Sequence, residues 1–399
     1  MIDVAAAEAM ILAHMPRFTA RHEPLASSAG RVLAEEVAAE RDQPPFDRVT
    51  MDGVAIAFSD WSAGVRSFAV LGTQAAGAEP LAIEGPAQCI EVMTGTALPR
   101  GADTVVPVER LERQGQSVTV SADAPVNARQ FVHRRGSDHA AGTVVLRAGI
   151  RLGPAEIAVL AGAGRPSALV AELPRVAVIS TGDELVEAGK PIAGHQIRST
   201  NDRAIEASLT QHRLGTVTRA RLRDDANALA VAIDRLDTEL DVLVLSGGVS
   251  MGQFDFVPSV LAELGAKLVF HRVAQRPGRP MWFGVSARGK PIFALPGNPV
   301  STLVCATRYL LPALRHASGL PPAAPELVEL AAPVEASPTL ALFTPVTLSS
   351  SDRGVLLAAP RPTNTSGDFV ALAGTDGFVE LAAYRGSYAA GSVARLFRW

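Results

Sequence analysis

The chain of 399 residues is 48% hydrophobic, and at roughly 100–200 residues per domain its length predicts two to four domains with sizeable cores. Its 37 Lys and Arg residues are balanced by 40 Asp and Glu residues, and the net charge of −3 argues against binding to a nucleic-acid backbone. The two cysteines, Cys89 and Cys305, cannot build a disulfide framework, which is typical of a reducing compartment, so we expect the cytoplasm.

Membrane insertion and zinc binding are also disfavoured. No stretch approaches the roughly 18 apolar residues of a membrane span, and the acids that follow Met1 argue against a signal peptide. The eight histidines show none of the spacings of a zinc site, so we expect any bound metal to be a hard ion held by oxygen.

The first half of the chain predicts a helical domain interrupted by a β-rich one. Residues 1–41 and 139–172 are rich in Ala, Leu and Val at helical spacing. Residues 42–138 instead contain short β-runs, such as 88–92 and 104–108, separated by Gly and Pro. We therefore expect one helical domain built from two segments, with residues 42–138 inserted between them.

The second half predicts a central α/β domain over residues 173–319. Runs at 175–180, 215–221, 241–245 and 292–295 predict strands, and helices are expected at 201–212, 225–236 and 299–316, the second capped by Asp224 or Asp225. Strands joined by helices predict a mostly parallel, covered sheet. After a proline-rich linker, the β-type runs of residues 320–399 predict a small C-terminal β domain.

Three polar loops follow three of the predicted strands, over residues 180–184, 246–255 and 295–301. Parallel sheets bind ligands at the carboxyl ends of their strands, glycines let backbone N–H groups approach a phosphate, and hydroxyls add donors. In the third loop Asn298 is the expected N-cap, which places Ser301 in the first helical turn, a ready anion site. Glu184 and Asp255 then suit magnesium, because carboxylates beside a phosphate need a cation between them. The loops predict divalent-ion-dependent nucleotide or phosphate chemistry.

Each loop also has a simpler interpretation, since a Gly/Ser turn is often only a turn and a surface acid is often only solvated. The segment 248–252 matches the G-x-S-x-G elbow of serine hydrolases around Ser250, but Gly252 and Gln253 continue the loop where an elbow needs a helix. The pair Gly162 and Gly164 lacks the third glycine and the ribose-binding acid of a dinucleotide site. Both alternatives are weaker than the phosphate hypothesis.

At these loops the sequence resembles the molybdopterin molybdenumtransferase family, which includes the bacterial MoeA proteins and the E domain of gephyrin. Motifs in the family's order carry the resemblance across essentially the whole chain: 44–47 with 51–53, 93–95 with 98–103, 135–138, 181–185, 246–255 and 295–301. The resemblance implies an α/β multidomain fold with a central mostly parallel sheet domain of molybdopterin-adenylyltransferase type, a helical domain from two segments, a β-rich inserted domain and a C-terminal β-barrel-like domain. It also implies an elongated homodimer whose active cleft joins the central domain of one subunit to the inserted domain of the other.

The resemblance further implies an enzyme of molybdenum cofactor biosynthesis. Such an enzyme takes adenylylated molybdopterin and molybdate, places the metal on the dithiolene and releases AMP with Mg²⁺ present. The implied partners are a second copy of the chain and, as a candidate, the adenylyltransferase of the same pathway, with no nucleic acid and no membrane. The alternative is a catalytically weakened paralogue that acts as a binding or scaffold partner in the pathway.

The family's functional positions can be carried over residue by residue. The matching catalytic positions are Asp52, Thr94, Asp138, Glu184 and Asp255, with Glu184 and Asp255 as the implied metal ligands. The matching substrate-binding positions are Thr181, Gly182, Asp183, Gly247, Gly248, Ser250, Asn298 and, in a nearby acid pair, Asp225. The matching molybdate positions are Arg276, Arg279, Pro280, Ser301 and Ser366.

The sequence also departs from the family pattern. The Asn-Ser-Ala that usually precedes the Met-Asp-Gly motif is replaced here by residues 48–50, Arg-Val-Thr, and the Tyr that follows is Val54. Arg276 and Arg279 stand where the family has lysines, and an arginine that helps to hold molybdate aligns with Pro345. The altered oxyanion residues favour the scaffold alternative, whereas the retained acids Asp52, Glu184 and Asp255 favour catalysis.

Overall fold

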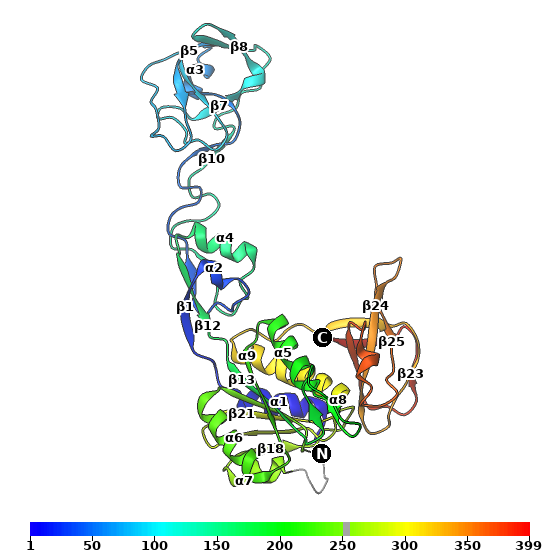
Figure 1. Ribbon diagram of the computed structural model, residues 1–399. Helices are drawn as coiled ribbons and strands as arrows, with labels where there is room; N and C mark the ends of the chain where they lie inside the picture. The colour runs from blue at the N-terminus through cyan, green and yellow to red at the C-terminus, as the bar shows by residue number, and fades with distance from the viewer. Residues whose placement is uncertain (250–255) are drawn as a thin grey trace. The chain divides into compact units, whose positions relative to one another are not determined.

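The structure is a computed structural model that describes residues 1–249 and 256–399 (Figure 1). The chain forms two compact units, one of residues 1–35, 148–153 and 168–399 and one of residues 36–147 and 154–167. Two predicted site residues, Ser250 and Asp255, lie outside the described residues. Among the helices that are described, none combines the length and the apolar character needed to cross a membrane.

The first unit contains the predicted central sheet. Its strand order is β16 (Thr216–Leu222), β13 (Arg175–Thr181), β17 (Val242–Ser246), β21 (Pro291–Leu295), β20 (Trp282–Val285) and β18 (Lys267–His271). The strands from β16 to β21 are parallel, and β20 and β18 run antiparallel at one edge. All residues of β17 and β21 are buried, because apolar runs of this kind suit strands covered on both faces. The prediction of a mostly parallel sheet is confirmed.

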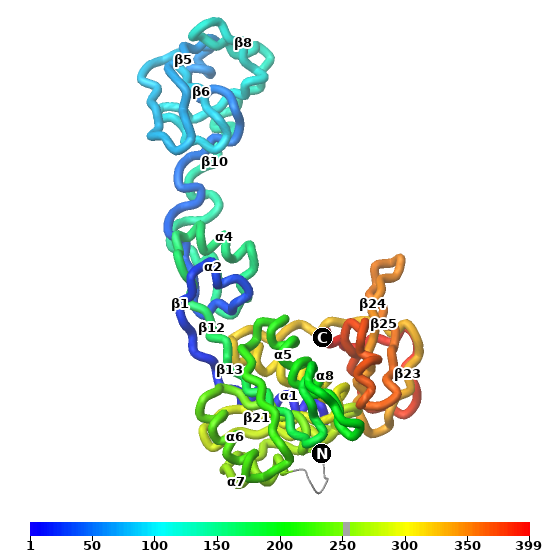
Figure 2. Tube along the Cα trace, in the orientation of Figure 1, coloured from blue at the N-terminus to red at the C-terminus, as the bar shows by residue number. Residues whose placement is uncertain are grey.

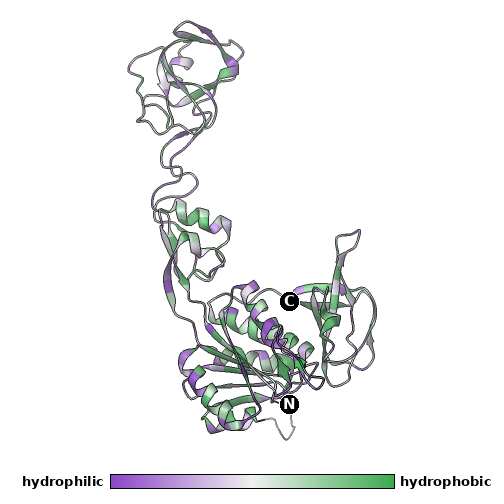
Figure 3. Ribbon diagram, viewed as in Figure 1, coloured by the Kyte–Doolittle hydropathy of each residue, from purple (hydrophilic) through white to green (hydrophobic). Residues whose placement is uncertain are grey.

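Helices cover both faces of this sheet. Along β13, Ala177 and Ile179 face one cluster, with α6 (Ala226–Glu239) and α7 (Val257–Glu263), since successive side chains of a strand alternate. Val176 and Val178 face the other cluster, with α1 (Val4–His14), α5 (Asn201–His212), α8 (Pro299–Cys305) and α9 (Leu311–Ala317). Figure 3 shows hydrophobic residues concentrated in this sheet and its covering helices.

The predicted helix over 299–316 is continuous but not uniformly α-helical. A π-helical turn, Ala306–Leu310, joins α8 to α9. Asn298 occupies the N-cap position, as predicted, but its side chain makes no capping hydrogen bond. Its Nδ2 instead donates to Ser366 Oγ at 2.7 Å, which ties the start of the helix to the C-terminal domain.

The C-terminal region forms the predicted barrel. Strands β24 (Ala341–Ser350), β25 (Leu356–Pro360), β22 (Glu326–Leu330), β28 (Val393–Arg398) and β26 (Gly377–Leu381) pair in this order, and β26 pairs back with β24. The short strand β19 (Gln275–Arg276) of the central domain adds in parallel to β24. The short strands β23 (Val334–Glu335) and β27 (Ser387–Tyr388) pair beside the barrel, and the turn η3 (Phe369–Leu372) contacts α8.

The second unit contains the β-rich insertion. One sheet has the order β7 (Thr104–Pro107), β4 (Gly53–Ile56), β6 (Gln88–Val92), β5 (Ser67–Gln74), β9 (Ser117–Val120) and β8 (Leu111–Gln114). Strands β3 (Arg48–Val49) and β10 (Val132–His133) form a separate pair, as do β2 (Val37–Ala38) and β11 (Val144–Leu146). Along the chain, the short helix α3 (Phe58–Ser62) connects β4 to β5, and the turn η1 (Val108–Arg110) connects β7 to β8.

The two segments predicted to be helical contain strands as well as helices. They contain α1, the single-turn α2 (Leu25–Ser28) and α4 (Pro154–Gly162), but also β1 (Ala20–Pro24) and β12 (Ser167–Ala171), which run side by side (Figure 2). Short Ala/Val/Leu runs carry no periodicity that separates a buried helix from a buried strand, which explains the difference. Helix α1 packs into the core of the central sheet, where Ala7 and Ile11 are buried.

A buried ion-pair cluster joins the N-terminal helix, the π-helical turn and the barrel. Arg308 is 1% exposed, donates from Nε to Glu380 at 2.6 Å and from Nη2 to Glu8 at 2.8 Å, and lies over the ring of Phe397. A guanidinium buried in this way is tolerated only while its partners satisfy it. These contacts therefore fix the barrel and α1 to the helix that begins at the predicted site.

We predict that Arg308→Ala will lower the free energy of unfolding of this unit by about 3–5 kcal/mol, because it leaves two carboxylates without their shared cation. The matched control is Arg21→Ala, which removes a 58% exposed arginine paired with Glu23 and should cost about 0–1 kcal/mol. Urea denaturation of both variants measures the difference. Equal losses would show that the buried cluster does not fix the barrel.

Candidate active site

The predicted loops lie together at one edge of the central sheet. Because β13, β17 and β21 are neighbours and parallel, the loops that follow them leave the sheet at the same edge. They line a cavity of about 820 Å³. The predicted substrate-binding or catalytic residues that line this cavity are Thr181, Glu184, Gly247, Gly248 and Asn298.

Asn201 connects two of these loops and was not among the predicted residues. It is the first residue of α5, and its Nδ2 donates to Ser246 Oγ at 2.8 Å and to the Gly297 carbonyl at 2.7 Å. An asparagine at the start of a helix is ordinary, so the sequence carried no signal for this role. The contact aligns the loops after β17 and β21.

The glycines allow these loops to pack closely around Thr181. Gly247 has a φ of +100°, and a Cβ at this position would lie 2.8 Å from the Thr181 carbonyl oxygen. A Cβ on Gly248, with a φ of +65°, would lie 2.9 Å from Val257 Cγ2. The Thr181 hydroxyl is buried without a hydrogen-bond partner among the described residues. A buried hydroxyl in that state costs free energy that a ligand or water can recover.

Two carboxylates line the same cavity, those of Glu184 and Asp224. Glu184 lies over the loop backbone, where a Cβ at Gly182 would be 2.6 Å from its Oε2. Asp225 instead caps α6, as one of the predicted N-caps, and accepts from the Ala228 N–H at 2.7 Å. Asp183 and Gly182 line a neighbouring polar cavity of about 420 Å³.

The donors of this cavity fit magnesium shared with a substrate. Within residues 1–249 and 256–399, no three His, Cys, Asp or Glu side chains cluster as a metal site. Mg²⁺ usually takes one or two carboxylates and completes its shell with phosphate oxygens and waters. Glu184 and Asp224 meet that requirement, while the other predicted ligand, Asp255, lies outside the described residues.

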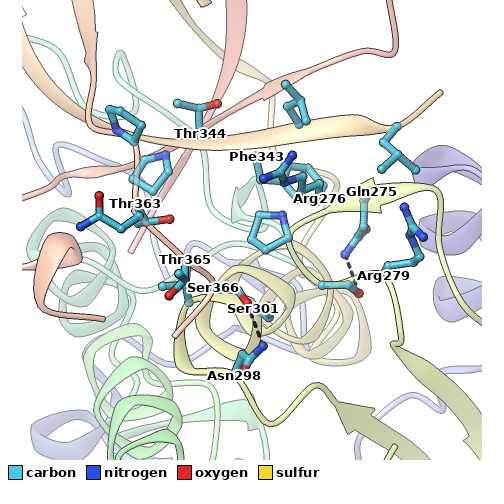
Figure 4. A pocket seen from close by; sticks show the side chains of 18 of the residues that line it. Gln275, Arg276, Arg279, Asn298, Ser301, Phe343, Thr344, Thr363, Thr365 and Ser366 are labelled. Atoms are coloured by element: carbon cyan, nitrogen blue, oxygen red, sulfur yellow. Dashed lines mark hydrogen bonds between the residues drawn. The ribbon is translucent and has the colours of Figure 1, made fainter. Parts of the chain in front are cut away.

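A second cavity, of about 640 Å³, adjoins the first. Figure 4 shows residues that line it. The two share Pro280, Pro296 and Asn298 in their linings. The second cavity brings together every residue predicted for molybdate: Arg276, Arg279, Pro280, Ser301 and Ser366. Pro345, where the resemblance implies an arginine in the family, lines it as well. The structure therefore places the predicted oxyanion residues beside the predicted phosphate loops.

The second cavity carries positive charge and polar donors. Arg276 and Arg279 are exposed, and neither forms an ion pair with any acid in the described part of the chain. Ser301 is 4% exposed in the first turn of α8, and Ser366 is held by Asn298 Nδ2 and by the Val300 N–H, which donates to its carbonyl at 3.0 Å. Unpaired guanidinium groups beside hydroxyls suit a compact oxyanion.

The second unit contains three further predicted catalytic residues, Asp52, Thr94 and Asp138. Asp52 Oδ1 accepts from the Thr94 N–H at 2.7 Å and from its hydroxyl at 2.8 Å. Both hydrogen bonds hold the pKa of the Asp52 carboxyl below its usual value. The bond from the Thr94 N–H has the larger effect, and the bond from the Thr94 hydroxyl has the smaller one. The structure thus brings Asp52 and Thr94 together and keeps the carboxylate ionised at neutral pH.

Asp138 forms a separate group in this unit. Its Oδ1 lies 2.9 Å from His133 Nε2, and an Arg48 nitrogen lies 3.1 Å from His133 Nδ1. Because arginine can only donate, Nδ1 accepts and Nε2 carries the proton toward Asp138. His133 and Arg48 are register partners across β10 and β3, a long-range pairing that the sequence did not predict.

Comparisons with known proteins identify the family of the chain. Family models match residues 2–164 (MoeA N-terminal region, domain I and II), 177–316 (probable molybdopterin binding domain) and 328–396 (MoeA C-terminal region, domain IV). The molybdopterin molybdenumtransferase of Synechocystis sp. is 39% identical over 400 residues and covers 100% of both chains. Molybdopterin molybdenumtransferase 2 of Mycobacterium tuberculosis is 34% identical over 307 residues, 75% of each chain.

Solved structures show the same similarity. A molybdopterin biosynthesis MoeA protein from Pyrococcus horikoshii matches with a TM-score of 0.86 at 30% identity, over 100% of this chain and 99% of that one. A second structure of a protein with this description matches with a TM-score of 0.83 at 26% identity over 100% of both chains. Because the family models, a full-length relative and the fold agree, the chain belongs to the molybdopterin molybdenumtransferase (MoeA) family.

Proposed function

We propose that the protein transfers molybdenum from molybdate to adenylylated molybdopterin and releases AMP, as a step of molybdenum cofactor biosynthesis in the cytoplasm. The observation that carries the proposal is the shared wall of two cavities. One is lined by glycine-rich loops and carboxylates, and the other by guanidinium groups that pair with no acid among the described residues. Two anionic substrates that must meet require such adjoining sites, since proximity and orientation lower the barrier of a bimolecular step.

Each group of residues has a separate proposed role. The backbone of Gly247 and Gly248, together with Thr181, binds the phosphate part of the organic substrate, and Glu184 and Asp224 hold Mg²⁺. When bound, the ion would supply positive charge beside the phosphate that leaves as AMP. Arg276 and Arg279, with Pro280, Ser301 and Ser366 around them, bind molybdate through fixed donors.

The remaining predicted residues and boundaries belong to the same proposal. Asp52, Thr94, Asp138 and Asp255 are proposed to surround the substrate and the ion, with the adenylyltransferase of the pathway as a candidate partner. The proposed domains are residues 1–41 with 139–172, 42–138, 173–319 and 320–399.

The decisive experiment follows AMP release by the purified protein from adenylylated molybdopterin. We expect release only when molybdate and Mg²⁺ are both present. The competing function, a scaffold with a weakened oxyanion site, is favoured by Pro345 in the lining of the oxyanion cavity. It would give binding of the organic substrate without molybdate-dependent release.

We predict that the active form is a homodimer in which Asp52 of one copy and Glu184 of the other serve one substrate. These residues belong to different compact units of the chain. Mixing inactive Asp52→Ala with inactive Glu184→Ala should restore part of the activity through hybrid dimers. Subunit exchange is checked with differently tagged copies, and no recovery after confirmed exchange would argue that each site is built within one chain.

We predict that Glu184→Gln will lower turnover at least about tenfold and weaken the dependence on magnesium, because the amide loses the charge that holds the ion. Glu184 is exposed and has little packing role, so thermal unfolding should change little. AMP release is titrated with Mg²⁺ for the wild type and the variant. A variant that melts far below the wild type yet keeps its specific activity would make the carboxylate structural.

We predict that Arg276→Lys or Arg279→Lys will raise the molybdate concentration needed for half-maximal activity by roughly an order of magnitude or more, because a point charge replaces a planar fork of donors. Adding Pro345→Arg in that background should recover part of the loss, since residue 345 lines the same cavity. Molybdate titrations of the single and double variants measure both effects. An unchanged requirement in the lysine variants would mean that the arginines are ordinary surface charges.

A further inference from the structure

The loop that carries both arginines, residues 276–279, is held from its inner side by one buried amide. Gln275 is 0% exposed, and its Nε2 donates to the Gly278 carbonyl at 3.2 Å and to Cys305 Sγ at 3.4 Å. Figure 4 shows the Gln275 side chain with its hydrogen bond, which goes to Gly278, as a dashed line. One side chain therefore spans the loop and reaches the helix behind it.

Tyr309 completes this contact from the helix. Its hydroxyl donates to Gln275 Oε1, and its side chain is 1% exposed. Burial raises the pKa of Tyr309, which keeps the hydroxyl protonated as a donor, and burial also raises the pKa of Cys305 to about 12. Ser301, Cys305 and Tyr309 are spaced four residues apart along one continuous helix. The helix that presents Ser301 to the oxyanion cavity thus also holds the arginine loop.

The loop has no free space on this side. Gly278 has a φ of +92°, and a Cβ there would lie 2.5 Å from Cys305 Sγ and 2.7 Å from Gln275 Nε2. On the opposite side, Arg276 pairs with Leu342 through the parallel contact of β19 with β24. The loop is therefore fixed between the barrel and the helix, and Gln275 supplies the side-chain connection to the helix.

We propose that Gln275 and Tyr309 are positioning residues of the oxyanion site, which hold the Arg276 and Arg279 guanidinium groups in one fixed relation to Ser301. The identity of the oxyanion rests on the proposed function. A small anion needs several donors that converge on it, and a donor that moves must be ordered again at each binding event. Removal of the Tyr309 hydroxyl therefore weakens binding of the oxyanion without changing the lining of the cavity, to which Gln275 belongs and Tyr309 does not.

The test is Tyr309→Phe, which deletes one hydroxyl and retains the ring. We expect the half-saturating molybdate concentration in AMP release to rise about five- to tenfold, while turnover at saturating molybdate stays within about twofold. Gln275→Leu should show the larger effect in the same direction. Should Gln275→Leu fail to fold, Tyr309→Phe still decides the outcome.

A matched control separates positioning from general loss of stability. Ser318→Ala also removes a buried hydrogen bond, from Ser318 Oγ to the Leu314 carbonyl at 2.8 Å, at the far end of the same helix. It should lower the melting temperature without changing the molybdate requirement. An equal rise in the requirement for Ser318→Ala and Tyr309→Phe would overturn the proposal.

A double-variant comparison tests whether the effect passes through the arginines. In an Arg276→Lys, Arg279→Lys background, Tyr309→Phe should raise the half-saturating molybdate concentration by a smaller factor than in the wild type. The guanidinium groups that Tyr309 helps to position are absent from that background. The same factor in both backgrounds would contradict the proposal.

Calorimetric titration with molybdate alone keeps the two hypotheses apart. If the wild type releases no AMP, the proposed function fails, and weaker molybdate binding by Tyr309→Phe than by the wild type still supports the positioning role. Equal affinity of the two proteins, or no molybdate binding by the wild type, would overturn it.

Discussion

The parallel hydrogen-bond ladder of β13, β17 and β21 is the constraint on which the rest of the site depends. Strands buried on both faces are mostly apolar, and their polar residues, such as Thr181 and Ser246, lie at their carboxyl ends. The other polar groups lie in the loops, and the ladder brings the carboxyl ends of the strands to one edge. Asn201 then aligns two of those loops by bonding to Ser246 and Gly297. The arrangement of the cavity is thus a consequence of backbone pairing among apolar strands.

The helix from Pro299 to Ala317 connects the cavity at the sheet edge to the C-terminal barrel. Its first turn presents Ser301 to the second cavity, and its π-helical turn places Arg308 between Glu8 and Glu380. The barrel is therefore attached to the same helix that borders the cavity. This attachment accounts for the C-terminal residues in the cavity wall, such as Ser366, which bonds to Asn298. Packing energy far from the cavity thereby contributes to its geometry.

Features set by local sequence were predictable, whereas features set by distant partners were not. The glycine loops after apolar runs and the Asp225 cap of α6 follow from residues a few positions apart, and both were predicted. The contacts of Asn201 and the pairing of His133 with Arg48 join residues 45 to 96 positions apart, so no local pattern announces them. Asp224 and Asp225 show most clearly what the sequence leaves undecided. Asp224 lines the cavity and Asp225 caps a helix, and only the geometry distinguishes these two neighbouring acids.

The resemblance to the family implies lysines at positions 276 and 279, and the arginines that stand there in this chain need more support from the surrounding structure. A lysine ammonium is a compact charge that attracts an anion from many orientations, whereas a guanidinium donates only in its own plane. Orientation therefore becomes part of the affinity, and two exposed arginines without acidic partners have no ion pair in the described chain to fix their planes. The backbone between them must do so. The buried bonds of Gln275 with Gly278 and Tyr309 restrain that backbone, and the directional donors make this restraint necessary.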